Sequence, residues 1–173
     1  MPSSYQAPNR KSEEKAKTVS QSASSNMSAA SASVHMVLDQ KGKNVFAIRP
    51  QDTLGKAVEV LRDKHIGALL VTDANGSLQG ILSERDIVRK LADTPGQTLP
   101  QKVEDVMTSE VQVCAPGDAM VDVLRRMTEG RFRHMPVADD SGLLGMVTIG
   151  DLVNFRLTQL EHEALQMKQL IVG

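Results

Sequence analysis

One pattern of residues occurs twice in this chain at a constant offset, and this internal repeat limits the possible fold more than any other feature. The step Pro-x-Asp occurs at Pro50 to Asp52 and again at Pro116 to Asp118. Asp52 and Asp118 are predicted to cap helices that begin directly after them. Both helices have an apolar face with the spacing i, i+3, i+4, i+7, made of Leu54, Ala57, Val58 and Leu61 in one copy and Met120, Val123, Leu124 and Met127 in the other.

The correspondence continues after the helices. Each has a short apolar run, a turn rich in Asp and Gly, and a second apolar run, which is typical of a hairpin, and a further strand precedes each helix. The predicted strands are residues 45–48, 68–71 and 78–82 in the first copy and residues 111–114, 134–137 and 144–148 in the second. Each copy therefore predicts the order strand, helix, strand, strand, helix.

A unit of this size cannot cover both sides of its own sheet, so the two copies are expected to pack together about a pseudo-twofold axis. The predicted fold class is α+β, with two β-α-β-β-α repeats and a C-terminal helix. We divide the chain into a disordered Ser/Ala-rich tail at 1–35, repeat 1 at 36–92, a linker at 93–102, repeat 2 at 103–155 and a C-terminal helical extension at 156–173.

The tail contains almost no branched apolar residue, so it cannot bury enough surface to offset the entropy lost on ordering. It lacks the continuous apolar stretch of a secretion signal. No run in the chain is long enough to span a membrane. A cytoplasmic location is therefore expected.

Composition argues against several classes of function. A net charge of −1 and a pI near 6.4 disfavour a broad contact with nucleic-acid phosphates, and the few aromatic residues are too scattered to stack bases. The single cysteine, Cys114, lies in an apolar run and is expected to be a buried core residue. The histidines have no metal-ligand spacing and no catalytic motif is present, so we predict neither a metal site nor an enzyme.

The C-terminal residues carry a pattern of their own. Apolar residues recur at alternating spacings of four and three, which is the seam of a coiled coil. Two interpretations stay open: a helix that lies on its own core, or a contact between two copies of the chain. The seam consists of Val153, Leu157, Leu160, Ala164, Met167 and Ile171.

Four segments of the chain resemble a known family. They are GILSERD at 80–86, GMVTIGD at 145–151, MTSEVQVCAPGD at 107–118 and RFRHMPV at 131–137. Together, in a duplicated unit, they are similar to a pair of CBS domains, the module named after cystathionine β-synthase. The resemblance implies a regulatory module that binds AMP, ADP, ATP or NAD in clefts between the two copies, forms a homodimer and signals to a protein target in trans.

Two tetrads, Ser83-x-x-Asp86 and Thr148-x-x-Asp151, are the first candidates for the site. The hydroxyl followed by an acid three residues later is the pattern of a helix capping box. The same carboxylate can accept from both hydroxyls of a ribose, so capping and ligand binding are compatible. Repetition of the tetrad favours a ligand contact at one or both copies.

The basic segment around Arg133 and His134 is the second candidate. The resemblance places a phosphate contact here, and arginine offers paired, permanently charged donors for phosphate oxygens. We assign phosphate to Arg133, with His134 as a second donor and Arg131 as a further candidate, in a site completed by Thr148 and Asp151. The alternative is a solvated rim, or pairing with nearby acids.

The first copy differs from the second at this point, since it has Gly67 and Ala68 where the second has Arg133 and His134. A ligand at Ser83 and Asp86 would need phosphate donors from elsewhere, such as His65 or Arg85. We therefore expect unequal sites, with the tighter one at Thr148 and Asp151. From the resemblance, the adenine slot is expected between Met135, Pro136, Ile149 and the segment that begins at Thr108.

A second function stays open beside nucleotide sensing. The chain could be a dimeric interaction protein whose clefts no longer bind a ligand. The presence of both acidic tetrads and the basic pair favours the nucleotide-sensing function.

Overall fold

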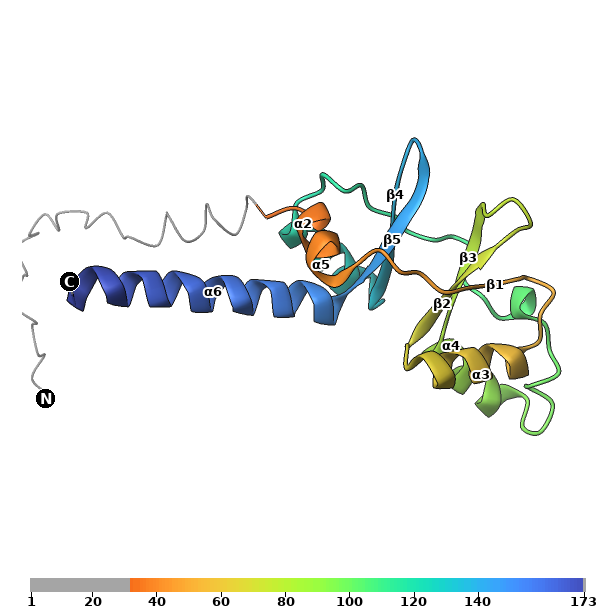
Figure 1. Cartoon of the computed structure of the whole chain (residues 1–173). Coiled ribbons are helices and arrows are strands. Elements are labelled where there is room, and N and C mark those ends of the chain that lie inside the picture. Colours follow the sequence, from red (N-terminus) through yellow and green to blue (C-terminus); the bar gives the residue numbers. More distant parts are fainter. Residues whose placement is uncertain (1–31, 173) are drawn as a thin grey trace, which may run out of the picture.

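The computed structural model describes residues 32–172, which form two small α+β units with a long helix that projects from the second unit (Figure 1). The first unit contains β1 (Ala47–Ile48), α3 (Leu54–Lys64), β2 (Ala68–Thr72), β3 (Leu78–Ser83) and α4 (Glu84–Asp93). The second contains α5 (Met120–Gly130), β4 (His134–Asp139), β5 (Gly142–Thr148) and the start of α6 (Ile149–Val172). The remaining elements are α2 (Val34–Lys41) and the short 3-10 helix η1 (Val103–Asp105).

The two sheets follow the predicted repeat. In the first unit β2 lies between β1, to which it is parallel, and β3, to which it is antiparallel. In the second unit β4 and β5 form an antiparallel pair. The strand expected at 111–114 is reduced to one parallel bridge between Cys114 and Val137, at the place where Ile48 faces Val71 in the first unit. The α+β fold with two β-α-β-β-α repeats is confirmed.

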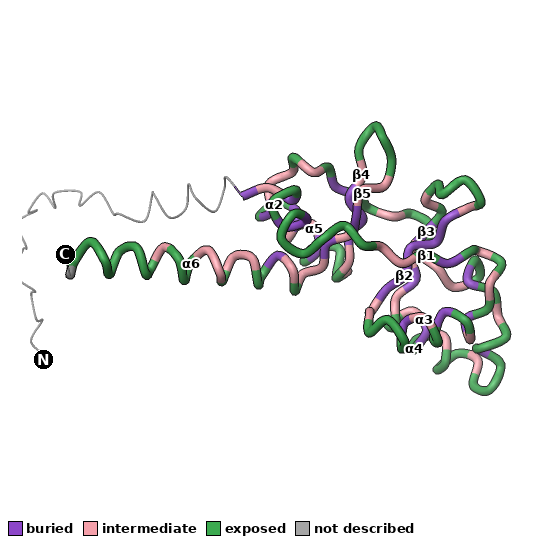
Figure 2. Tube along the Cα trace, viewed as in Figure 1, coloured by how far each residue is buried: buried purple, intermediate pink, exposed green. Residues whose placement is uncertain are grey.

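Each unit has its own hydrophobic core, and each core is completed by a segment from outside its repeat (Figure 2). Helix α2 packs on the second unit through Val34, Val37 and Leu38, although it precedes the first unit in the chain. A Cβ on Gly145 of β5 would come within 2.9 Å of Leu38, so glycine allows this close approach. In the opposite direction, Val103 of η1 is buried in the core of the first unit.

This crossing bears on the expected domain limits. The boundary predicted after residue 35 falls inside α2, and backbone hydrogen bonds from Val34 to Asp118 and from Met120 to Ala32 hold this segment to the second unit. Residues 1–31 of the predicted tail lie outside the described residues. The C-terminal helix is present, and it begins at Ile149, directly after β5.

The predicted helix caps are displaced by one residue. The N-cap of α3 is Thr53, whose hydroxyl accepts from the backbone N–H of Lys56, and the N-cap of α5 is Ala119. The carboxylates of Asp52 and Asp118 instead accept from the backbone N–H groups of Arg49 and Ala115, three residues earlier. Each aspartate therefore closes the turn before its helix, which is a common use of an Asp side chain in turns.

Helix α6 contacts the second unit only at its start. Leu152 is buried and Phe155 packs at the edge of the core, whereas Leu157 and the seam residues after it are exposed (Figures 1 and 2). Among residues 32–172, none of the helices combines the length and apolar character that a membrane span requires.

Candidate functional site

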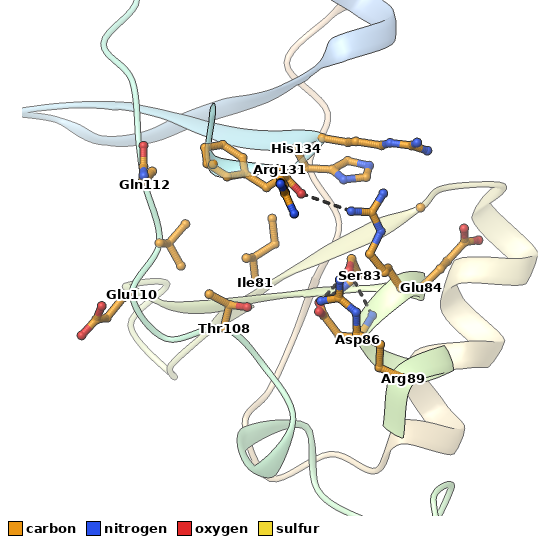
Figure 3. Close-up of a pocket in the computed structure, with 16 residues that line it drawn as sticks. Ile81, Ser83, Glu84, Asp86, Arg89, Thr108, Glu110, Gln112, Arg131 and His134 are labelled. Carbon is orange, nitrogen blue, oxygen red and sulfur yellow. Dashed lines mark hydrogen bonds between the residues drawn. The ribbon is translucent and has the colours of Figure 1, made fainter. Parts of the chain in front are cut away.

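A cavity of about 420 Å³ lies between the two units (Figure 3). This volume is within the range of about 300–1,000 Å³ that is usual for small-molecule sites. Its walls come from four parts of the chain: Gly67 before β2, the end of β3 with the first turns of α4, the connector at 108–112, and the turn between α5 and β4 at 130–134. The site is therefore formed only when both units pack together.

Ser83 and Asp86 form one wall of the cavity through a capping box at the start of α4. The hydroxyl of Ser83 accepts from the backbone N–H of Asp86, and Asp86 Oδ2 accepts from the backbone N–H of Ser83 at 2.9 Å and from its hydroxyl at 2.6 Å. Within residues 32–172, every hydrogen bond to this carboxylate goes to Oδ2. Asp86 Oδ1 is thus left to accept from a ligand, and capping does not compete with binding.

The basic segment reaches the cavity because α5 ends in a left-handed residue. Arg131 is the C-cap of α5 and has φ 56°. The backbone then turns, so that Phe132, Arg133 and His134 run along the cavity into β4. Across the cavity, Arg85 Nη1 donates to the Arg131 carbonyl at 3.1 Å, which ties α4 of the first unit to this turn (Figure 3).

Gly67 makes room for His134. A Cβ on Gly67 would lie 3.3 Å from His134 Nε2, so the ring of the second unit occupies the space that a side chain at this position of the first unit would need. Gly67 is the residue that replaces arginine in the first copy of the repeat. Glycine in the first copy, where the second copy has arginine, therefore allows the two units to pack together at the site.

The connector is held against the edge of β3. Thr108 and Ile81 exchange two backbone hydrogen bonds, each of 2.9 Å. A Cβ on Gly80 would come within 2.9 Å of the Thr108 carbonyl, so glycine is required for this approach. Glu110, Val111 and Gln112 follow along the cavity without belonging to a strand.

Four arginines line the cavity: Arg85, Arg89, Arg131 and Arg133. Within the described residues, the side chains of Arg89, Arg131 and Arg133 take part in no ion pair or hydrogen bond. The acids Glu84 and Glu110 also line the cavity, but in Figure 3 their carboxylates point away from its centre. The cavity therefore presents four arginines but only one carboxylate that faces a ligand, Asp86, and this excess of positive charge favours an anionic ligand.

His134 lies among these cations, and its environment disfavours a further charge. Burial is the main cause that lowers the pKa of His134 below its usual value of 6.5, and the positive charges of Lys41, Arg133 and Arg85 lower it further, against an opposite effect of Asp151. The ring is therefore neutral at neutral pH, and it can donate one hydrogen bond to a ligand.

The structure brings together seven of the twelve residues that the sequence assigned to the site. Those that line the cavity are Ser83, Arg85, Asp86, Thr108, Arg131, Arg133 and His134. Those that do not are Met135, Pro136, Thr148, Ile149 and Asp151. Met135 and Pro136 are buried, and Ile149 packs against the core of the second unit, so these three are not walls of the described cavity.

Arg133 lines this cavity and Asp151 does not, although the sequence predicted that they share one site. Asp151 caps α6, where its Oδ2 accepts from the backbone N–H of Thr148 at 2.8 Å, and it forms an ion pair with Lys41 of α2. Of the two tetrad acids, Asp86 is the one that lines the same cavity as Arg133. The reason is the packing of the units, which places the basic turn of the second copy opposite the tetrad of the first.

Arg89 and Phe132 also line the cavity, although neither was predicted from the sequence. A signal for Arg89 was present, because it lies one helical turn after Arg85 and three residues after Asp86, and so shares their side of α4. Phe132 lies within the basic segment itself. Neither residue stands out without knowledge of which surfaces meet.

The sequence profile of the CBS domain matches two regions of the chain, residues 41–93 and 103–158. The chain belongs to the CBS-domain family. A crystal structure of a CBS-domain containing protein from Agrobacterium tumefaciens superimposes with a TM-score of 0.71 at 38% identity, over 72% of this chain and 99% of that one. The Arabidopsis thaliana protein named CBS domain-containing protein CBSX3, mitochondrial, is 31% identical over 83% of this chain and 73% of its own length.

Some CBS-domain relatives are much longer proteins. An inosine-5'-monophosphate dehydrogenase of Methanocaldococcus jannaschii is 35% identical over 66% of this chain, but the match covers only 22% of the enzyme. The shared part is the CBS pair, so the dehydrogenase activity is not carried over to this chain. CBS domains are generally regulatory modules that bind nucleotides. Among residues 32–172, the structure has no group of His, Cys, Asp and Glu side chains that could hold a metal ion.

Proposed function

We propose that this chain is a regulatory CBS module that binds one adenine nucleotide, AMP, ADP, ATP or NAD, in the cavity between its two units. The observation that carries the proposal is the set of three arginines, Arg89, Arg131 and Arg133, which line one cavity without carboxylate partners in residues 32–172. Phosphate oxygens are the ligand atoms that such guanidinium groups bind best.

Each group of the ligand has a counterpart in the cavity. Asp86 Oδ1 is assigned to the ribose hydroxyls, and Ser83 keeps the carboxylate oriented through Oδ2. Arg133 and Arg131 are assigned to phosphate, with the neutral ring of His134 as a further donor. The base is assigned to the space between Ile81 and the connector, where the apolar residues Ile81 and Val111 line the cavity.

The ligand would act on the contact between the units, because its two ends bind different units. Asp86 belongs to the first unit and Arg133 to the second. A bound nucleotide therefore favours the arrangement in which both are engaged, and a protein target that reads this arrangement receives the signal in trans. The module is proposed to act as a homodimer, and its cytoplasmic location stays a prediction.

The alternative is an interaction protein with degenerate clefts. One observation favours the loss of ligand binding at the tetrad of the second unit. Lys41 is paired with Asp151, so the tetrad of the second unit is already engaged by the chain itself. The cavity at Asp86 has no such internal partner among the described residues. The two functions therefore differ in whether this one cavity binds adenylates.

Calorimetry with AMP and with adenosine tests the proposal. The wild-type chain is expected to bind one AMP, and Asp86→Ala is expected to lose both ligands because the ribose contact is lost. Arg133→Ala should weaken AMP by about 1.5–3 kcal/mol, roughly 10- to 150-fold, with little effect on adenosine. Asp151→Ala is the matched control, since it alters the equivalent tetrad outside the cavity.

The absence of heat and of any thermal shift with AMP, ADP, ATP and NAD would favour the alternative function. Equal losses of AMP and adenosine in Arg133→Ala would contradict the phosphate assignment. An effect of Asp151→Ala as large as that of Asp86→Ala would place the ribose contact in the other tetrad.

A further inference from the structure

Helix α6 presents an apolar seam that nothing in the described chain covers. Within residues 32–172, α6 packs on the second unit through its first turns and then projects away from it (Figure 1). The seam from Leu157 to Ile171 is exposed throughout, from 41% at Leu160 to 84% at Ile171. The part of α6 beyond residue 158 also lies outside the CBS match. The interpretation of this helix as one that lies on its own core is therefore wrong for the distal part.

The seam has the heptad order of a coiled coil. Leu157, Ala164 and Ile171 occupy the a positions, and Leu160 and Met167 occupy the d positions. Over the helix rise of about 1.5 Å per residue, the seam is roughly 21 Å long. Leu160 at d and Ile171 at a are residues that favour a two-stranded assembly.

The charged residues beside the seam identify the partner and its direction. Arg156 and Glu163 occupy g positions, and Glu161 and Lys168 occupy e positions. In a parallel pair of identical helices, each g residue faces the e residue five positions later in the other helix. Arg156 then meets Glu161 of the partner subunit, and Glu163 meets Lys168 of the partner subunit, so both pairs join opposite charges.

An antiparallel pair would join like charges. With Leu160 packed against Ala164 of the partner subunit, Glu161 faces Glu161 of the partner subunit and Glu163 faces Glu163 of the partner subunit. In the single chain, Arg156 Nη1 lies 3.6 Å from Glu163 Oε1, and the pairs between two chains would replace this contact. The opposite-charge pairs at e and g therefore favour the parallel arrangement.

We propose that two copies of this chain associate through α6 as a parallel two-stranded coiled coil over residues 156–171. The assembly would hold the two CBS modules at one end of a shared stalk. This inference does not depend on the nucleotide site, because no residue of the seam lines the cavity.

Cross-linking through an added cysteine tests the direction of the pair. In a parallel coiled coil, the two copies of position 171 meet across the seam, so Ile171→Cys should give a disulfide-linked dimer under mild oxidation of the full chain. Adding Leu160→Lys should reduce the cross-linked fraction by about ten-fold, since a charge at d disrupts the seam. Leu165→Lys is the matched control, because Leu165 is also exposed, at 56%, but lies off the seam.

A charge exchange provides the second arm. Glu161→Lys should weaken cross-linking, because it places a cation against Arg156 of the partner subunit, and the double variant Arg156→Glu with Glu161→Lys should restore it. Circular dichroism serves to check that each variant folds. No disulfide at position 171, equal cross-linking with Leu160→Lys and Leu165→Lys, or no restoration by the double variant would each overturn the proposal.

Discussion

Lys41 Nζ lies 2.5 Å from Asp151 Oδ2, which joins the end of α2 to the start of α6. The equivalent acid of the first unit, Asp86, has no cation bound to it within residues 32–172 and faces the cavity. Two copies of one tetrad are therefore in different chemical environments. The difference arises because α2 crosses from the first part of the chain to pack on the second unit.

The first prediction follows from this ion pair. Removing the ammonium in Lys41→Ala leaves Asp151 free to accept from a ribose, so the stoichiometry of adenosine binding measured by calorimetry should rise from about one to about two per chain. Residues 65–68 of the first copy correspond to the basic segment 131–134 of the second, but they contain no arginine. The new site should therefore bind AMP no better than adenosine. Unfolding free energy should change by less than about 1 kcal/mol, since the pair is partly exposed.

Lys43→Ala is the matched control for this experiment, because Lys43 is an exposed lysine of the same segment that has no described partner. It should leave the stoichiometry at one. If Lys41→Ala also bound a single adenosine, the ion pair would not be what keeps the second tetrad closed.

The fold could be predicted from the sequence because its signals are local and occur twice. The spacing of Leu54, Ala57 and Leu61 reappears in Met120, Val123 and Met127, and all six are buried. The capping boxes at Ser83 and Thr148 depend on residues three positions apart, so they too are visible in the sequence.

The placement of Arg133 and Asp86 in one cavity could not be predicted, because it depends on which faces of the two units meet. From the repeat alone, the acidic tetrad and the basic residues of the same copy would be expected to bind one ligand. The packing of α2 was missed for a similar reason: Val34, Val37 and Leu38 are few, and their helix follows Ser33, which makes no side-chain cap. Their partner surface lies in the second unit, which the local pattern does not indicate.

The second prediction concerns the left-handed residues Arg131 and His65, which end α5 and α3 with φ 56° and φ 53°. A non-glycine residue in this region is strained by about 1 kcal/mol, so glycine at either position should stabilise the fold by up to about this amount in urea unfolding. Only Arg131→Gly should also weaken AMP, because Arg131 lines the cavity and His65 does not. Equal AMP affinity in both variants would remove Arg131 from the site.

The third prediction is a pH dependence of stability. Burial lowers the pKa of His134 below 6.5 in the folded chain, so the unfolded chain binds the proton first as the pH falls. Protonation of His134 in the unfolded chain therefore lowers the free energy of unfolding as the pH falls below about 6.5. Above this pH the ring is neutral in both states, and the free energy of unfolding is not reduced. Between pH 7.5 and 5.5, the melting temperature of the ligand-free His134→Gln variant should fall less than that of the wild type.

His162→Gln serves as the control for this measurement, because His162 is exposed on α6. Its melting temperature should follow the wild type over the same interval. Parallel curves for the wild type and His134→Gln would show that the protonation of this ring does not limit stability.

The last prediction concerns the thiol of Cys114. Burial is the main cause that raises its pKa to about 11, and its Sγ lies 3.7 Å from the Pro136 carbonyl, to which it donates. Because the thiolate is the reactive form, a disulfide reagent at pH 8 should modify this residue only as fast as the chain unfolds. Ser141→Cys, at an exposed turn, should react at once in the same folded protein and so report that the reagent is active. Rapid loss of the Cys114 thiol in folded chain would show that the core of the second unit opens, whereas slow loss means that an added cysteine on α6 can be cross-linked without replacing Cys114.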